Sequence, residues 1–358
     1  MVRTPAHADD VAKELLAAGV SSRAATGCAR RRNGAWAREF GGDRHRFFDL
    51  ASVTKPMTAV AVATEPELRH SPLRSSVSEV EGTASADVAL ELLLAHRAGL
   101  EANLPLFLPR VTGNDVDLAD ALRRASDARR PETRGLAVPE GGFDPLYSDL
   151  GYVLVGEALA RRERVPDAGE GIARRVVAAL GAERTLGTRR SLARAGVDLE
   201  PDVAPTEDVA WRGGVVRGWV HDENAFALTG AGGSGHAGMF GTVAAVLAFG
   251  EAVLDAVLGR GGPFSGVDLA WLVAERPGGT LRAGFDGKSP ESSSAGDAFG
   301  PRAFGHLGFT GTSLWIDPDA EVVVAVLTNR VHPTRDNVRI RAARPVAHSA
   351  LFARATTL

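Results

Sequence analysis

Apolar residues repeat at helical spacing in the first segment of the chain and then give way to shorter runs. Residues 8–19 have this helical spacing, and the pattern stops at Gly19. Two short runs flank Asn33-Gly34, a dipeptide typical of tight hairpin turns, and they predict a pair of antiparallel strands. The stretch FDLASVTKPMTAVAVA at 48–63 follows, and its small, apolar second half predicts a buried helix.

The middle of the chain, from 66 to 225, has mainly helical patterns. Helices are expected in SADVALELLLAHRAGL, ending at Gly99, in LYSDLGYVLVGEALARRE and in GIARRVVAALG. Loops that contain proline and glycine, such as 131–145, separate them.

The last third of the chain mixes helices with strands. TVAAVLAFGEAVLDAVLG predicts an amphipathic helix that Thr242 caps. GHLGFTGTSLWIDP and EVVVAVLTNR predict strands joined by a turn at Asp317-Pro318-Asp319, with GHLG opening the first strand. NVRIRAARPVAHSALFAR predicts a closing helix that Pro345 interrupts, and the Gly- and Ser-rich segment 282–300 predicts a mobile loop.

Strands therefore lie at both ends of the chain, and helices fill the middle. We predict an α/β (α+β) fold with an antiparallel sheet that is flanked by helices and built from both chain ends. Residues 1–65 and 226–358 would form this domain, and residues 66–225 an inserted, mainly helical domain. A cleft between two such domains is the expected place for a functional site.

Composition narrows the classes of protein that fit. The chain has 358 residues, is 44% hydrophobic and has a formal net charge of -3, which gives no field to attract nucleic acid or an anionic membrane. Its single cysteine, Cys28, excludes an internal disulfide. The start lacks the apolar core of a secretory signal and no run is long enough to span a bilayer. We expect a cytoplasmic protein; the oligomeric state and a signal peptide upstream of the given start stay open.

The candidate chemistry begins with Ser52 and Lys55. Only three of the 41 basic residues are lysines, and one of them lies one helical turn after this serine. A serine hydroxyl is a weak nucleophile that needs a base. A lysine can supply that base if burial lowers its pKa, whereas an arginine stays protonated.

Two further segments contain groups that suit the same reaction. Tyr147 stands in YSDLG at the head of a helix, and a tyrosine close to a lysine ammonium can act as a base or proton shuttle. The run from His306 to Gly308 includes a glycine that allows close approach of another backbone. The N–H of Phe309 beyond it would pair with the N–H of Ser52 as an oxyanion hole.

In this order, Ser-Val-Thr-Lys, Tyr-Ser-Asp and His-Leu-Gly resemble the serine β-lactamase and penicillin-binding-protein superfamily. The likeness is nearest to its class C-like branch, which includes esterases and D-alanyl-D-alanine carboxypeptidases, and it runs from 23 to 330. The resemblance implies a serine hydrolase in which Ser52 forms an acyl-enzyme on a small-molecule acyl substrate. It also implies that Lys55 and Tyr147 share the base work, without a metal or another cofactor.

Two departures from the family pattern affect the expected substrate. Asp149 stands where many members have Asn, and its carboxylate would hold Lys55 cationic and shift base duty toward Tyr147. His306 and Leu307 replace the Lys-Thr or Lys-Ser that binds a substrate carboxylate in the family. Thr310 and Thr312 lie beyond them and are expected to replace part of that carboxylate binding. We therefore expect carboxylic esters, with Asp149, His306, Gly308 and Thr310 as the substrate-binding residues.

Other functions stay as alternatives. A β-lactamase or D-alanyl-D-alanine carboxypeptidase activity ranks second, and a non-catalytic binding protein of the same fold ranks third. His221, Asp222 and His236 match no zinc spacing, and Asp222 and Asn224 are expected to make turn hydrogen bonds. GAGGSGHAG lacks the context of a phosphate loop, and His96 is expected as a helix C-terminal cap.

Overall fold

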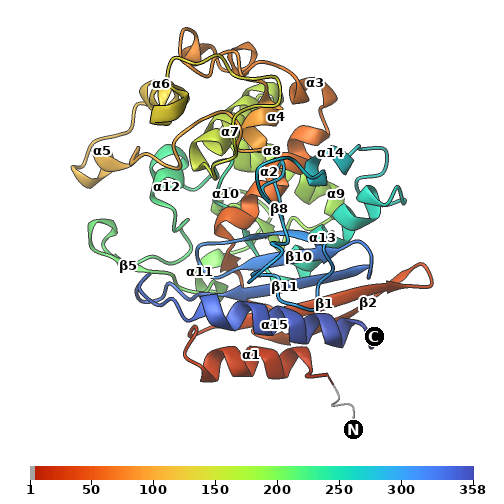
Figure 1. Cartoon of the computed structure of the whole chain (residues 1–358). Helices are drawn as coiled ribbons and strands as arrows, with labels where there is room; N and C mark the ends of the chain where they lie inside the picture. Colours follow the sequence, from red (N-terminus) through yellow and green to blue (C-terminus); the bar gives the residue numbers. More distant parts are fainter. Residues whose placement is uncertain (1–4) are drawn as a thin grey trace.

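A six-stranded antiparallel sheet, in the order β2-β1-β11-β10-β9-β8, joins the two ends of the chain (Figure 1). The structure is a computed structural model and describes residues 5–358. The strands of this sheet are β1 (Ala24–Arg32), β2 (Ala35–Gly42), β8 (Asp286–Gly287), β9 (Phe304–Leu307), β10 (Ser313–Asp317) and β11 (Val322–Thr328). β1 pairs with β11 so that Ala24 lies opposite Thr328, which confirms the expected sheet built from both chain ends.

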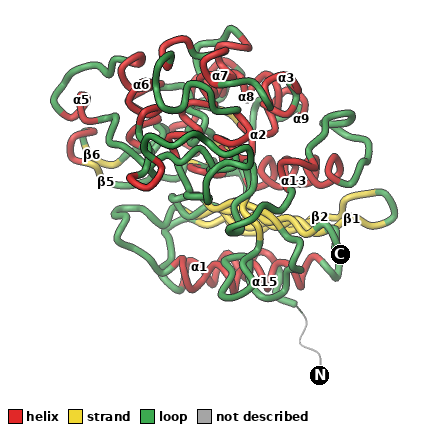
Figure 2. The backbone as a smooth tube through the Cα atoms, turned by 45° about the horizontal axis from the view of Figure 1, so that its top comes forward, coloured by secondary structure: helices red, strands yellow, loops and turns green. Residues whose placement is uncertain are grey.

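Helices cover both faces of this sheet. α1 (Ala8–Ala17) and α15 (Ile340–Ala355) pack on one face, and α13 (Val243–Val257) packs on the other (Figures 1 and 2). β11 is buried along its whole length because its alternate side chains enter two different cores. Val322, Val324 and Val326 belong to the core beneath α1 and α15, whereas Val323, Ala325 and Leu327 belong to the core beneath α13.

The rest of the chain is mainly helical and lies on the same side of the sheet as α13 (Figure 2). Its helices are α2 (Thr54–Ala63), α3 (Pro66–Arg69), α4 (Leu90–Leu94), α5 (Leu108–Val111), α6 (Leu118–Asp127), α7 (Asp149–Glu163), α8 (Ala168–Ile172), α9 (Ala178–Leu180), α10 (Arg189–Arg194), α11 (Leu199–Asp202), α12 (Glu223–Thr229) and α14 (Ala270–Val273). Short strands β3 (Phe48–Asp49), β7 (Phe240–Gly241) and β4 (Leu186–Gly187) form a second sheet, and β5 (Asp208–Val209) pairs with β6 (Gly214–Val215). The domain boundaries at 65 and 226 stay a prediction.

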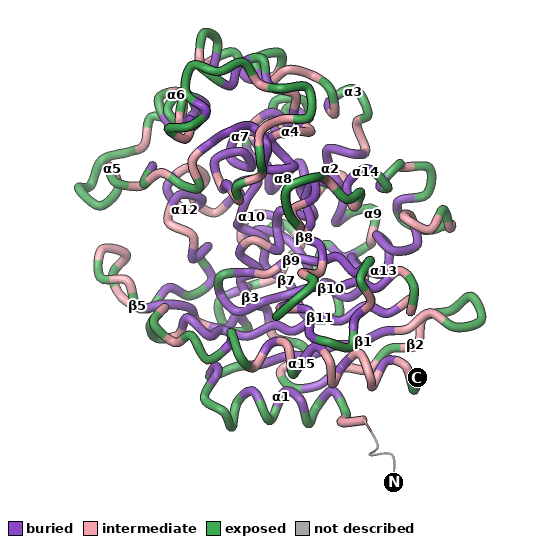
Figure 3. Tube along the Cα trace, in the orientation of Figure 1, coloured by how far each residue is buried: buried purple, intermediate pink, exposed green. Residues whose placement is uncertain are grey.

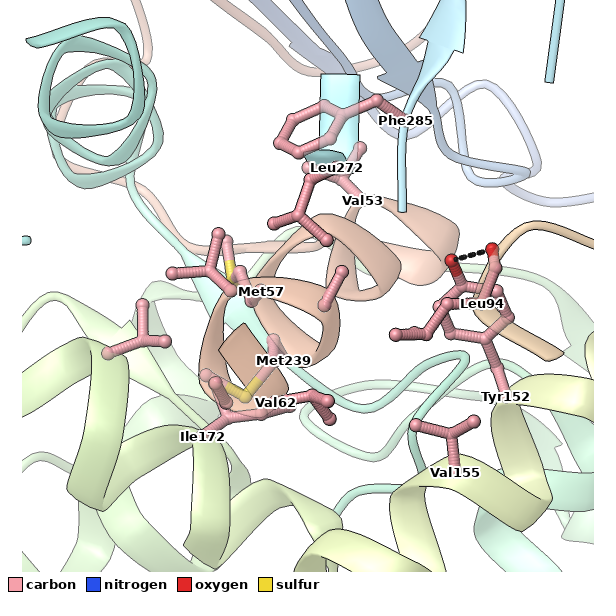
Figure 4. Packing of buried hydrophobic residues seen from close by; sticks show 14 of the residues in the cluster. Val53, Met57, Val62, Leu94, Tyr152, Val155, Ile172, Met239, Leu272 and Phe285 are labelled. Carbon is pink, nitrogen blue, oxygen red and sulfur yellow. Dashed lines mark hydrogen bonds between the residues drawn. The ribbon is translucent and has the colours of Figure 1, made fainter. Parts of the chain in front are cut away.

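Helix α2 lies at the centre of the molecule. All ten of its residues are buried, and the trace around it is buried as well (Figure 3). Met57 and Val62 of α2 pack in one apolar cluster with Met239 and Ile172 (Figure 4). Because α2 is buried on every side, the polar side chains of its first turn have to find their partners inside the protein.

Several local predictions are confirmed. Asn33 and Gly34 have φ angles of 51° and 82°, the left-handed conformation that a tight hairpin turn requires. The Thr242 side chain accepts a hydrogen bond from the N–H of Ala245 and so caps α13. Asp317 Oδ1 accepts the N–H groups of Asp319 and Ala320, which closes the turn between β10 and β11.

Four local predictions are wrong. The helix expected to end at Gly99 spans only Leu90–Leu94, because the chain turns with a positive φ at His96. GHLG ends β9 instead of opening a strand. Segment 282–300 contains the edge strand β8 and the buried Phe299, which packs against Trp315, so it is anchored at both points. Pro345 does not interrupt α15.

None of the helices in residues 5–358 has the combination of length and apolar character needed to cross a bilayer.

Candidate active site

Ser52 lies in a tight turn that leads into α2. The 3₁₀ turn Ala51–Val53 begins with Ala51 at a φ of 47°, a conformation that costs an alanine about 1 kcal/mol or more. Asp49 stabilises it, since its Oδ1 accepts the N–H of Ala51 at 2.8 Å and its Oδ2 accepts the N–H of His221 at 2.6 Å. The chain therefore holds the serine in a strained but well-supported position.

The turn after β9 holds the same segment from the other side. The Thr310 hydroxyl donates to the carbonyl of Asp49 at 2.7 Å, and the Thr312 hydroxyl donates to the carbonyl of Leu50 at 2.9 Å. A Cβ on Gly308 would lie 2.5 Å from the Leu50 carbonyl oxygen, so only glycine lets these two backbones approach. These contacts connect the Ser52 turn to the main sheet.

Lys55 is buried and lies between Ser52 and Asp149. Its Nζ donates to Ser52 Oγ at 2.9 Å, to Asp149 Oδ1 at 2.6 Å and to the carbonyl of His236 at 3.5 Å. Burial lowers the pKa of Lys55, but the charge of Asp149 and the proximity of Tyr147 outweigh it, so the pKa is raised. The expectation that burial lowers the pKa of this lysine is therefore wrong, because Asp149 supplies a counter-charge.

Tyr147 lies beside the same ammonium. The Lys55 Nζ is 4.8 Å from the centre of its ring. Burial raises the pKa of Tyr147, although the nearby ammonium and hydrogen bonding to Lys55 and Ser52 oppose that effect. At neutral pH the resting site therefore holds a lysine ammonium and a neutral phenol.

These groups open onto one cavity of about 450 Å³. Its lining includes Ser52, Tyr147, Asp149, Gly308 and Phe309. Within residues 5–358, the N–H groups of Ser52 and Phe309 have no hydrogen-bond acceptor. Two free donors beside a serine hydroxyl are what a developing oxyanion requires.

Two residues expected to bind substrate do not line this cavity. The Thr310 hydroxyl is used on the backbone of Asp49, as described above. His306 is buried with its ring centre 5.9 Å from that of Tyr147, and its Nδ1 contacts the carbonyl of Leu307 at 2.8 Å. Burial and the charge of Lys55 lower the pKa of His306 to about 3, so it is neutral. Its side chain supports Tyr147 instead of facing the cavity.

Three histidines make contacts around the site that the sequence did not predict. His221 contacts Glu207 through Nε2 at 2.9 Å and stacks on Phe309, while His236 contacts Asp222 through Nε2 at 2.8 Å. His96 lies against Tyr147 instead of only ending a helix. Asp222 caps α12 as expected, but Asn224 holds the loop before α5 by accepting the N–H of Phe107. In the described part of the chain, no three His, Cys, Asp or Glu side chains converge in a way that would hold a metal ion.

A family model described as Beta-lactamase matches residues 20–348. The chain belongs to the Beta-lactamase family. A relative from Escherichia coli K12, provisionally named D-alanyl-D-alanine carboxypeptidase, is 32% identical over 124 residues. That match covers 32% of this chain and only 27% of the relative, so it spans about a quarter of the relative's length.

Two solved structures show the fold of this Beta-lactamase family member at low sequence identity. EstCE1, described as a hydrolase with promiscuous acyltransferase activity, has a TM-score of 0.64 and 19% identity, covering 94% of this chain and 97% of its own. A class C beta-lactamase from Rhodobacter sphaeroides has a TM-score of 0.64 and 15% identity, covering 94% and 97%. At this level of identity, both matches show that the fold is shared.

One wall of this Beta-lactamase-family cavity is strongly basic. Arg330, Arg341 and Arg344 line it beside Gly308 and Phe309. Arg344 is buried, burial and the charge of Arg330 lower its pKa to about 10, and its Nε has no hydrogen-bond partner within residues 5–358. Its Nη2 donates to the carbonyls of Gly308 and Thr312 at 3.5 and 3.4 Å, and the lining of the same cavity also includes Asp149, Asp222 and Glu223.

Proposed function

We propose that this protein is a serine hydrolase that cleaves carboxylic esters through an acyl-enzyme on Ser52. The observation that supports this most directly is the 2.9 Å contact between Lys55 Nζ and Ser52 Oγ at the floor of the cavity. Membership of the Beta-lactamase family and the likeness to EstCE1, a hydrolase, support the same reaction class.

Acylation begins with the loss of the Ser52 proton. As Ser52 Oγ attacks the ester carbonyl carbon, its proton passes to Lys55, which in turn gives one of its own protons to Asp149 at 2.6 Å. The N–H groups of Ser52 and Phe309 receive the negative oxygen. The C–O bond to the alcohol then breaks, and the alcohol oxygen takes the phenol proton of Tyr147. The proton on Asp149 returns through Lys55 to Tyr147.

Deacylation uses the same groups. A water molecule gives its proton to the Lys55–Asp149 pair as its oxygen attacks the acyl carbon. The bond to Ser52 breaks, the carboxylic acid leaves, and the pair returns the proton to Ser52 Oγ. The raised pKa of Tyr147 suits a proton donor to the leaving group better than a resting base.

The ester preference rests on the residues at the end of β9. His306 is neutral and does not line the cavity, whereas the aliphatic Leu307 does. Neither side chain can supply the charge or hydroxyl that holds a carboxylate at this position.

The test is a panel of p-nitrophenyl esters, a chromogenic cephalosporin and D-alanyl dipeptides, run on the wild type and on Ser52→Ala. We expect ester hydrolysis to fall by about 10³-fold or more in the variant. A fluorescent fluorophosphonate should label the wild type at Ser52 and leave Ser52→Ala unlabelled. Hydrolysis that survives the substitution would mean another nucleophile, and an unlabelled, inactive wild type would support the non-catalytic alternative.

The basic wall favours a second candidate, hydrolysis of β-lactams or D-alanyl peptides, which carry a carboxylate. Arg344 lines the cavity and carries a charge that suits such a group, and the Escherichia coli relative bears a carboxypeptidase name. Matched acetyl and succinyl p-nitrophenyl esters, on the wild type and Arg344→Met, separate the two candidates. If the second holds, the succinyl ester is preferred and only its KM rises in the variant.

A further inference from the structure

His96 holds the backbone on both sides of Tyr147. Its carbonyl oxygen accepts the N–H of Leu146 at 3.1 Å, and its Nδ1 accepts the N–H of Ser148 at 3.0 Å. His96 has a φ of 60°, a conformation that non-glycine residues adopt rarely. One residue therefore binds the peptide groups before and after Tyr147, at a cost in backbone strain.

The imidazole of His96 also packs on the phenol ring itself. The ring centres of His96 and Tyr147 are 4.8 Å apart with 28° between the planes. Tyr152 lies 5.2 Å away on the His96 ring, and its hydroxyl donates to the carbonyl of Leu94 (Figure 4). His96 is thus fixed between the buried Tyr152 and the Tyr147 ring.

This contact requires one protonation state of His96. Nδ1 must lack a hydrogen to accept the N–H of Ser148, which places the ring hydrogen on Nε2. The groups that face the ring are the Lys55 ammonium, the neutral His306 and the two tyrosines. Burial and the charge of Lys55 hold the pKa of His96 well below its ordinary value, so the acceptor persists at neutral pH.

The helix-end role expected from the sequence does not need this ring. The last turn of α4 is closed by backbone bonds, from the N–H of Ala95 to Glu91 and from the N–H of Arg97 to Leu92. The His96 side chain is therefore free to bind the Tyr147 segment.

We propose that His96 is a positioning residue that fixes the Tyr147 hydroxyl toward Lys55 and the leaving group. This inference rests on the proposed function, in which Tyr147 donates a proton to the departing alcohol. His96 does not line the cavity, and its role would be to keep the Tyr147 hydroxyl in place.

The test is a double-mutant cycle of His96→Asn and Tyr147→Phe, followed by ester hydrolysis. Asn tolerates a positive φ but has no ring to stack on Tyr147. We expect His96→Asn to lower kcat by about tenfold or more with little change in KM, and to have no further effect in the Tyr147→Phe background. Equal effects of His96→Asn in both backgrounds would overturn the proposal.

Two controls keep the outcomes separate. His45→Asn makes the same exchange at an exposed histidine and should leave kcat unchanged. If His96→Asn does not fold, ¹⁵N NMR of the wild-type histidines decides: Nδ1 of His96 should be unprotonated at neutral pH because it accepts the N–H of Ser148, and a protonated Nδ1 would contradict the proposal. Activity that survives Ser52→Ala would refute the proposed function itself, whereas additive effects in the cycle would refute only the role of His96.

Discussion

The ammonium of Lys55 lies 2.6 Å from a carboxylate oxygen of Asp149, and no water separates them. This ion pair crosses from α2 to the first residue of α7, so it connects the two halves of the site. It explains how a fully buried lysine remains charged, since burial alone would favour the neutral amine. The first prediction follows from removing the carboxylate.

Asp149→Asn should change the pH dependence of hydrolysis. Without the carboxylate, burial lowers the pKa of Lys55, and the lysine must lose its proton to solvent before it can accept one from Ser52. The acidic limb of kcat/KM against pH should then follow the pKa of Lys55 and move to higher pH than in the wild type. We also expect kcat/KM at pH 7 to fall by about tenfold or more. An unchanged profile would show that Asp149 takes no part in proton transfer.

Thr310→Val should destabilise the protein through the turn that carries Ser52. The substitution keeps the size of the side chain but leaves the buried carbonyl of Asp49 without its donor. We expect the free energy of unfolding in urea to fall by about 1–3 kcal/mol. Thr310→Ser retains the hydroxyl and is the matched control. Equal losses in both variants would mean that packing of the methyl group, and not the hydrogen bond, matters here.

Gly308→Ala should impair both stability and activity. The new Cβ would overlap the Thr312 hydroxyl and lie 2.5 Å from the Leu50 carbonyl oxygen, so the backbone beside the free Phe309 N–H has to move. We expect a loss of about 1–3 kcal/mol in unfolding free energy and a lower kcat. Gly261→Ala, where nothing lies within 4 Å of the added Cβ, is the control and should behave as the wild type in both measurements.

His348 should make the protein sensitive to mild acid. It is buried and neutral, with Nδ1 donating to the carbonyl of Ser294 and Nε2 accepting from Ser313, and burial lowers its pKa to about 3. The unfolded chain binds a proton here near pH 6.5, so this stability is present above that pH and is lost as the pH falls toward 3. The group alone accounts for about 2 kcal/mol between pH 7 and pH 5.

Urea unfolding of the wild type and of His348→Gln at these two pH values measures that contribution. The difference in stability between pH 7 and pH 5 should be smaller in the variant. His45→Gln is the control, because His45 is exposed and its replacement should leave the difference unchanged. The same pH dependence in His348→Gln and the wild type would contradict the prediction.

The contacts that the sequence predicted depend on local spacing. Ser52 and Lys55 are three residues apart at the head of a helix, and this spacing already brings their side chains within reach. The hairpin at Asn33-Gly34 and the cap at Thr242 are equally local, since each depends on residues within one turn. The family motifs added Tyr147, which no spacing argument could have placed there.

The parts that were missed depend on segments that meet only in the folded chain. The pKa of Lys55 is raised by Asp149, which is 94 residues away in the sequence. The hydrogen bond from the N–H of Ser148, next to Tyr147, to His96 joins residues 52 positions apart. Thr310 was expected in the cavity because it lies close in sequence to Gly308, but the turn after β9 directs its hydroxyl to Asp49. Which way a turn residue points is decided by tertiary packing, and pattern alone does not carry that information.

The pairing of β1 with β11 has a consequence for synthesis on the ribosome. A ribosome has to complete Thr328 before Ala24 has its strand partner, and the turn that holds Asp49 and Leu50 is made only slightly earlier. Such distant pairings form slowly, because the intervening chain must be brought together first. A nascent chain therefore carries Ser52 long before Thr310 and Thr312, whose hydroxyls hold the backbone of the turn that contains this serine, have been added.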